Sequence, residues 1–165
     1  MKIGAHVSAS GGVSNAIDRA LKIGAETIQI FASSPRTWKF KHPSELEINR
    51  LKLKESETSI TPIFLHASYL INMGAKGDLL RKSIELLVDH MLAAGRIGAR
   101  GVIFHGGSHK GVGFDAVLPQ ASVALKEVLD RTPCDVDLLI ENSAGMGNQI
   151  GASFEEIGQL VNSVN

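Results

Sequence analysis

Short apolar segments alternate along this chain with longer segments in which apolar residues recur at intervals of three and four. Small or polar residues follow each short segment, a pattern typical of β-strands that end in loops. We therefore predict strands at Ile3–Val7, Thr27–Phe31, Pro62–Leu65, Gly101–Phe104 and Val136–Ile140. The longer segments predict amphipathic helices at Val13–Ile23, Ser44–Glu57, Leu79–Ile97, Asp115–Asp130 and Phe154–Val161.

Three of the predicted helices have candidate capping residues at their amino ends. Ser44 and Glu47 have the S-x-x-E spacing of a capping box. Asp78 and Ser153 precede the third and fifth helices, where a side-chain oxygen can accept a hydrogen bond from a free backbone N–H group.

Strands that alternate with helices of this length indicate βαβ units, a parallel sheet and right-handed crossovers. The fold class is therefore α/β. The chain has no linker, low-complexity tract or break in composition, so we expect residues 1–165 to form a single domain.

Five strands are compatible with two architectures. A doubly wound, flavodoxin-like sheet is complete with five strands and suits a chain of 165 residues. A (β/α)8 barrel of about 250 residues uses about 31 residues per unit, so this chain would supply about five of eight units. Length alone favours the doubly wound sheet.

Residues of the types that bind metals stand at the ends of three successive strands: His66, His105 and Glu141. His6 stands near the end of the first strand. The carboxyl ends of all strands of a barrel meet at one face, whereas in an open sheet the outer strands lie farther apart. Two imidazoles and one carboxylate with an open fourth position are typical of a catalytic zinc site. This pattern shifts the prediction to an incomplete barrel.

A single histidine after a strand is more often an ordinary polar residue at a loop boundary than a ligand, so the metal hypothesis depends on the three positions together. His42 precedes Pro43 in a loop, and His90 lies within a helical pattern. We expect both to be structural or solvated. His6, and His109, which follows His105 closely, are candidate outer partners of the metal ligands.

The segment Ser33–Pro43 combines basic and aromatic residues directly after the second strand. Arg36, Lys39 and Lys41 alternate with Trp38 and Phe40 (residues 36–41). Cations can contact phosphates and aromatic rings can stack on bases, so the segment is a candidate nucleic-acid contact. The alternative is a solvated loop that Trp38 anchors to the core.

Composition narrows the possible partners and compartments. With 44% hydrophobic and 21% charged residues the chain has an ordinary globular profile, and its 17 basic and 17 acidic side chains give no net charge. A nucleic-acid partner would therefore be bound by a local patch. The single Cys134 excludes an internal disulfide and suits a reducing compartment. With neither a secretion signal nor an apolar run of about 20 residues, we expect a cytoplasmic protein without membrane contact.

Several motifs together resemble endonuclease IV, in order from Met1 to about Asn165. They read GAHVSASGG, PRTWKF, HASYLIN, FHGGSH and IENSAG. The resemblance implies an eight-stranded barrel of the xylose-isomerase-like type with a cluster of three zinc ions. It implies an apurinic/apyrimidinic endonuclease of base excision DNA repair, monomeric at full length. Such an enzyme cuts the phosphodiester 5′ to abasic sites in double-stranded DNA and leaves a 3′-hydroxyl and a 5′-deoxyribose phosphate.

The resemblance also assigns roles to individual positions. His66 and His105 are implied to hold the first zinc, and Glu141 to bridge it to the second while orienting the attacking water, as the catalytic residue. The DNA contacts implied by matching motifs are Arg36, Thr37, Trp38, Tyr69 and Asn72.

The sequence departs from the family pattern at three positions and in one larger respect. Thr37 stands where the family often has glutamine, Ala67 where it has aspartate and Gly106 where it has proline. The family's ligands from later strands have no counterpart before Asn165. We therefore expect a fragment of a longer protein, with ligands for one zinc fully present.

Two other functions stay open at this point. A sugar isomerase or epimerase can share the barrel and its metal ligands at strand ends, although its sites favour carboxylate-rich binding of manganese or magnesium. A truncated module that binds DNA weakly, or has no activity, is the non-enzymatic alternative.

Overall fold

The computed structural model describes residues 1–145 and 147–164, so Met146 and Asn165 lie outside the described residues. Its strands are β1 (Gly4–His6), β2 (Thr27–Ile30), β3 (Ile63–His66), β4 (Gly101–His105) and β5 (Asp137–Glu141). Its helices are α1 (Asn15–Lys22), α2 (Glu45–Glu57), α3 (Gly77–Ile97), α4 (Phe114–Asp130) and α5 (Phe154–Val164). The alternation predicted from sequence is confirmed.

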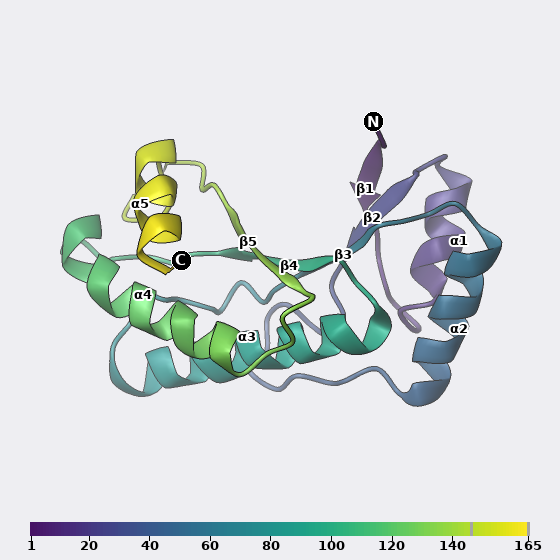
Figure 1. The fold of residues 1–165 in the computed structure, drawn as a ribbon, viewed down its shortest axis with the longest axis horizontal. Coiled ribbons are helices and arrows are strands. Elements are labelled where there is room, and N and C mark those ends of the chain that lie inside the picture. Colours follow the sequence, from purple (N-terminus) through teal and green to yellow (C-terminus); the bar gives the residue numbers. More distant parts are fainter. Residues whose placement is uncertain (146, 165) are drawn as a thin grey trace.

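All strands pair in parallel and in the order of the chain, from β1 to β5, in the described part of the protein. A doubly wound sheet places a later strand on the far side of β1, so the flavodoxin-like alternative is wrong. In Figure 1 the sheet curves and the helices follow one another around its outside, from α1 and α2 beside β1 and β2 to α5 beyond β5. The arrangement is an arc of a (β/α) barrel.

The core lies between the outer face of the sheet and the helices. Alternate strand residues such as Ile30, Leu65 and Val102 point to that face and are fully buried. They meet the apolar face of the helices, including Leu87 and Met91 of α3. The side chains of the other strand residues, which alternate with these, point to the concave face of the sheet. None of the helices described is long and apolar enough to cross a membrane.

Two of the three predicted helix caps are confirmed. The Ser44 hydroxyl accepts from the backbone N–H of Glu47 at 3.3 Å, and the Ser153 hydroxyl accepts from that of Glu156 at 3.2 Å. The prediction for Asp78 is wrong, because α3 begins earlier, with Lys76 at the capping position. Asp78 lies in the first turn and forms an ion pair with Lys82 at 2.7 Å.

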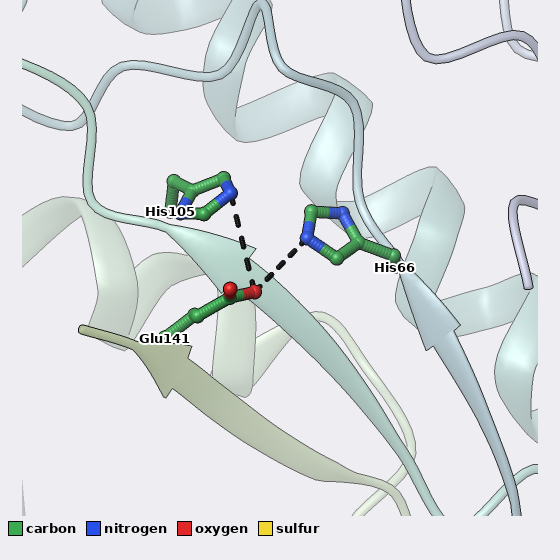
Figure 2. Close-up of side chains that lie close together, drawn as sticks. All are labelled: His66, His105 and Glu141. Atoms are coloured by element: carbon green, nitrogen blue, oxygen red, sulfur yellow. Dashed lines mark hydrogen bonds and ion pairs between the residues drawn. The ribbon is translucent and has the colours of Figure 1, made fainter. Parts of the chain in front are cut away.

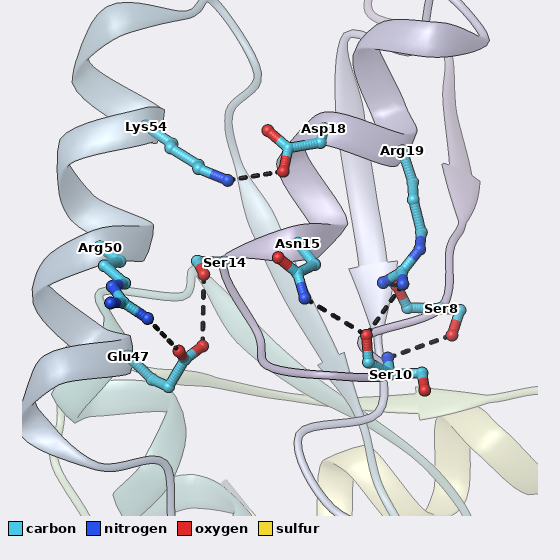
Figure 3. Close-up of polar contacts among 9 residues, drawn as sticks. All are labelled: Ser8, Ser10, Ser14, Asn15, Asp18, Arg19, Glu47, Arg50 and Lys54. Atoms are coloured by element: carbon cyan, nitrogen blue, oxygen red, sulfur yellow. Dashed lines mark hydrogen bonds and ion pairs between the residues drawn. The ribbon is translucent and has the colours of Figure 1, made fainter.

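The Glu47 side chain joins α2 to the start of α1 instead of closing a reciprocal capping box (Figure 3). Its carboxylate accepts from the Ser14 hydroxyl at 3.2 Å. Farther along the same helix pair, Lys54 forms an ion pair with Asp18 at 2.6 Å. Arg19 donates to the backbone carbonyls of two loop residues that follow β1. These contacts fix the loop between β1 and α1.

Three strands extend one residue farther than their apolar pattern predicted. β3, β4 and β5 end at His66, His105 and Glu141, respectively, so these side chains belong to the strands themselves. Parallel pairing continues past the last apolar residue, and the N–H of Ala67 still donates to the carbonyl of Ile103 at 2.8 Å. The ladder therefore holds the backbone of these polar residues.

His90 is a structural residue within α3. Its Nδ1–H group donates to the carbonyl of Leu86 at 2.7 Å, and its ring contacts that of Phe40 with centroids 4.6 Å apart. Burial lowers the pKa of His90 to about 4, although the bond to Leu86 and the charge of Asp89 oppose this shift. The folded protein thus holds a neutral imidazole here.

Protonation of His90 should couple the stability of the fold to pH. Because its pKa is about 4 in the folded protein and 6.5 without burial, the unfolded chain binds the extra proton between these values. The free energy of unfolding should therefore fall as the pH drops through this window, by up to about 3 kcal/mol. We expect His90→Gln to remove this part of the pH dependence, measured by urea unfolding between about pH 7 and about pH 4.5. The exposed His42→Gln variant is the control, and equal pH dependence in wild type and His90→Gln would contradict the assignment.

Candidate metal centre

The side chains of His66, His105 and Glu141 converge at the carboxyl ends of β3, β4 and β5 (Figure 2). One ligand atom from each lies within 4.8 Å of the others. The strand register explains this convergence. His105 and Glu141 are direct partners in the ladder, and His66 pairs with Ile103, two residues before His105, so all three point to the same face.

The distances within this group suit one small cation. The Oε2 atom of Glu141 lies 3.1 Å from Nε2 of His66 and 3.9 Å from Nε2 of His105. Ligands about 2.0 to 2.1 Å from a tetrahedral zinc lie about 3.3 Å from one another. Small side-chain rotations would therefore bring the three atoms around one ion.

Hydrogen bonding fixes which nitrogen of His66 faces the group. Its Nδ1 lies 2.7 Å from the carbonyl oxygen of Ala67, which can only accept, so Nδ1 carries the proton. In the neutral form of the ring, Nε2 then carries the lone pair and faces the Glu141 carboxylate at 3.1 Å. Nε2 of His66 and the Glu141 carboxylate are then both acceptors, and they attract each other at this distance only through a shared proton or cation. The carbonyl of Ala67 on the other side of the ring is of the kind that commonly bonds metal-binding histidines.

Burial also favours the neutral form of the neighbouring imidazole of His105. Partial burial lowers the pKa of His105 below its ordinary value, and His66 adds to the shift while Glu141 opposes it. A lowered pKa leaves the nitrogen lone pair available near neutral pH, which is the state that binds a metal.

His6 lies beside the three converging side chains. Its ring stacks on that of His66 with centroids 5.8 Å apart, and Phe31 contacts both rings, with centroids 4.5 Å from His6 and 5.1 Å from His66. Nδ1 of His6 lies 2.7 Å from the side-chain amide of Gln29. An outer role for His6 beside the candidate metal ligands stays a prediction. The contribution of Gln29 was missed from sequence, although its place in β2, between buried isoleucines, puts it on the concave face.

His109 lies in the loop after β4 and bonds with the backbone of neighbouring loops. Its Nδ1 accepts from the backbone N–H of Gly113 at 3.1 Å, and its own N–H donates to the carbonyl of Asn148 at 2.8 Å. Both contacts shape loops around the site. The described contacts do not include one between His109 and His105, so an outer role for His109 stays a prediction.

An open groove of about 900 Å³ leads from the three converging side chains to the loop after β2. His105 and Glu141 line one part, and Trp38 and Tyr69 line another. Tyr69 is half exposed, and its ring stacks on that of His105 with centroids 6.0 Å apart. Two aromatic side chains thus line the groove, and one of them, Tyr69, contacts the candidate metal centre.

The basic and aromatic loop after β2 is only partly directed to solvent. Arg36, Thr37 and Trp38 are exposed, as a contact surface requires. Phe40 instead packs against His90 and the core, so its predicted role in base stacking is wrong. The Thr37 hydroxyl donates to the carbonyl of Lys39 at 3.2 Å and helps to shape the loop.

Asn72 lines the groove, but its carbonyl oxygen is already bonded within the protein. It accepts from the backbone N–H groups of Gly74 and Ser108. Contact of Asn72 with DNA stays a prediction, and the structure adds a role in holding loops together.

Comparisons with known proteins agree with the fold and the motifs. The family described as xylose isomerase-like TIM barrel matches residues 17–165. A relative from Halothermothrix orenii named probable endonuclease 4 is 38% identical over 165 residues, which cover 99% of this chain and 59% of the relative. The crystal structure of endonuclease IV from Thermus thermophilus superposes with a TM-score of 0.87 at 33% identity, covering 98% of this chain and 59% of that one. The resemblance to endonuclease IV is confirmed.

A second group of structures is similar in fold alone. D-psicose 3-epimerase from Clostridium cellulolyticum superposes with a TM-score of 0.70 at 17% identity, covering 100% of this chain and 60% of that one. The chain therefore spans about three fifths of the length of the proteins it matches.

The three converging side chains should bind a divalent transition metal. We expect His105→Ala and Glu141→Gln each to weaken Co²⁺ binding by more than the roughly 10- to 100-fold that loss of an outer partner typically costs. Titration monitored by the visible absorption of bound Co²⁺ measures this. The control is His42→Ala, whose imidazole is exposed and paired with Asp89. Equal losses in the control and in the other variants would place the metal elsewhere.

Proposed function

The chain belongs to the xylose isomerase-like TIM barrel family, and from this premise we propose that it carries part of a zinc-dependent apurinic/apyrimidinic endonuclease. The proposed reaction is hydrolysis of the phosphodiester 5′ to an abasic site in duplex DNA. The observation that carries the proposal is the convergence of His66, His105 and Glu141 beside a groove bordered by Trp38 and Tyr69. The similarity to proteins named endonuclease 4 and endonuclease IV supports it.

The donor atoms favour zinc. Two imidazole nitrogens and one carboxylate oxygen form a set typical of catalytic zinc, whereas magnesium and calcium prefer oxygen ligands. When bound, zinc polarises a phosphate, lowers the pKa of bound water toward about 7 and stabilises the leaving oxygen.

Glu141 has two tasks in this proposal. Its Oε2 atom is the one that approaches both imidazoles, which leaves Oε1 for a second ion or for the water that attacks the phosphate. His66 is held by its bond to Ala67 and by the ring of His6, so it presents Nε2 from a fixed position. A fixed ligand arrangement lowers the cost of reaching the reactive geometry.

The groove supplies surfaces for damaged DNA. Arg36 is an exposed cation that can contact phosphates or fill the gap of a missing base, with Thr37 and Asn72 as further polar contacts. Trp38 and Tyr69 offer rings on which bases or the abasic sugar can pack. An abasic nucleotide leaves the helix at low cost, because it has no pair or stack to break. Thr37 is short, so Arg36 and Trp38 would carry most of the recognition.

A sugar isomerase or epimerase is the weaker alternative. The similarity to D-psicose 3-epimerase shows the fold alone. Sites of that kind favour more carboxylates than the single one in this group, and they give no reason for a tryptophan at the groove or for an exposed arginine in the same loop.

We expect Arg36→Ala and Trp38→Ala to weaken binding to a duplex with one abasic site while leaving metal binding unchanged, because the loop borders the groove and not the metal ligands. Loss of an aromatic stack of about 1 to 3 kcal/mol corresponds to roughly 5- to 150-fold in affinity. Fluorescence anisotropy at fixed salt measures this. Lys52→Ala, which removes an exposed charge from α2, is the matched control for Arg36. If both loop variants bind like wild type, the groove is not the DNA surface.

A nicking assay on the same duplex with added zinc tests the reaction itself. The protein should cut on the 5′ side of the lesion, and Glu141→Gln should abolish cutting, whereas Glu155→Gln, an exposed site on α5, should not. We expect the 165-residue chain alone to cut more slowly, by about a thousandfold or more, than the same chain supplied with the portion of a relative that it does not span. Loss of a catalytic metal removes several kcal/mol of transition-state stabilisation, and each 1.4 kcal/mol lowers the rate about tenfold. No cutting in either form, with zinc bound, contradicts the proposed reaction.

A further inference from the structure

The side chain of Asn72 connects two of the loops that border the groove. Its Oδ1 atom accepts from the backbone N–H of Gly74, in its own loop, at 3.0 Å. The same atom accepts from the N–H of Ser108, in the loop after β4, at 2.9 Å. One carbonyl oxygen thus uses both of its lone pairs across loops that are far apart in sequence.

Asn72 is itself held firmly. It is only 9% exposed, and its backbone N–H donates to the Ser83 hydroxyl at 3.0 Å. Ser83 is fully buried in α3, and its hydroxyl donates in turn to the carbonyl of Leu79 at 2.8 Å. The position of the carboxamide is therefore tied to a long helix as well as to the loops.

The loop after β4 is shaped to receive this side chain. Gly107 has φ +91°, and a Cβ atom there would lie 2.4 Å from Oδ1 of Asn72. A side chain at Gly74 would likewise meet the carbonyl of Ser108 at 2.7 Å. Two glycines thus permit an approach that side chains would prevent.

The connection continues to the loop that follows Glu141. The N–H of Ile150 donates to the carbonyl of Gly107 at 2.9 Å, and Ser108 pairs with Gln149 in an antiparallel bridge. The loops after β3, β4 and β5 therefore form one hydrogen-bonded unit, with Asn72 at its centre.

We propose that Asn72 is a positioning residue whose carboxamide oxygen fixes the relative placement of Tyr69 and His105 on the wall of the groove. Asn72 follows Tyr69 by three residues, and Ser108 follows His105 by three. The hydrogen bond from Ser108 to Asn72 therefore joins the two loops close to both aromatic side chains. Their rings stack with centroids 6.0 Å apart and planes 27° from parallel. The consequence for catalysis rests on the proposed function, whereas the geometry does not.

The oxygen and the amide nitrogen of Asn72 can be tested separately. Asn72→Asp keeps an acceptor oxygen in either ionisation state, whereas Asn72→Ala removes both groups. A positioning role through the oxygen survives the first change and not the second. A contact that needs the amide N–H group would be lost in both variants.

The experiment is nuclear magnetic resonance on the metal-free full chain, with Asn162→Ala, an exposed site on α5, as control. In Asn72→Ala we expect the Ser108 and Gly74 amides to exchange with solvent at least about fivefold faster, the ratio that corresponds to loss of one hydrogen bond. We also expect the His105 imidazole resonances, which report its stack with Tyr69, to shift. Asn72→Asp and the control should match wild type.

Unchanged exchange and unchanged His105 resonances in Asn72→Ala would overturn the proposal. If Asn72→Ala does not fold, Asn72→Asp decides alone: wild-type exchange and resonances support the role of the oxygen, and faster exchange of Ser108 and Gly74 overturns it. A zinc titration of the wild type is separate. If zinc does not bind, the proposed function fails, while the metal-free measurements still decide the role of Asn72.

Discussion

Parallel pairing of strands in the order of the chain is the constraint on which the rest of this structure depends. It places the carboxyl ends of β1 to β5 along one rim, where polar side chains from distant parts of the sequence meet. His105 and Glu141 are neighbours because their strands are in register, and His66 joins them because the stagger between β3 and β4 is an even number of residues. A slip of one residue in either ladder would turn one ligand toward the helices.

The two faces of the sheet divide the work between stability and chemistry. Buried aliphatic residues on the outer face pack the sheet against the helices, so polar side chains can occupy the concave face. Loops at the rim then need their own support, and hydrogen bonds provide it. The carbonyl of Pro35 accepts from Ser68 and Tyr69, and Asn72 accepts from Ser108, so the loops after β2, β3 and β4 are linked. A groove built from linked loops can hold Trp38 and Tyr69 near His105 and Glu141 without a large rearrangement.

The elements and the convergence of His66, His105 and Glu141 could be predicted from the sequence, because both depend on local periodicity and on motifs at strand ends. It placed the ends of β3, β4 and β5 a residue early, since pairing with a neighbour extends these strands past the last apolar position, and it placed the ends of β1 and β2 a residue late. It missed the inward packing of Phe40, which tertiary contacts decide, and the start of α3 at Gly77, which places Asp78 inside the first turn. The bond from Asn72 to Ser108 joins residues far apart in sequence, and no pattern along the chain signals it.

The central claim is that the strand ends assemble a zinc site from His66, His105 and Glu141. X-ray diffraction from zinc-soaked crystals, collected on both sides of the zinc absorption edge, tests it most directly. The account predicts one anomalous peak about 2.0 to 2.2 Å from Nε2 of both histidines and from a carboxylate oxygen of Glu141. Zinc peaks only at other positions, with these three side chains left without an ion between them, would contradict it.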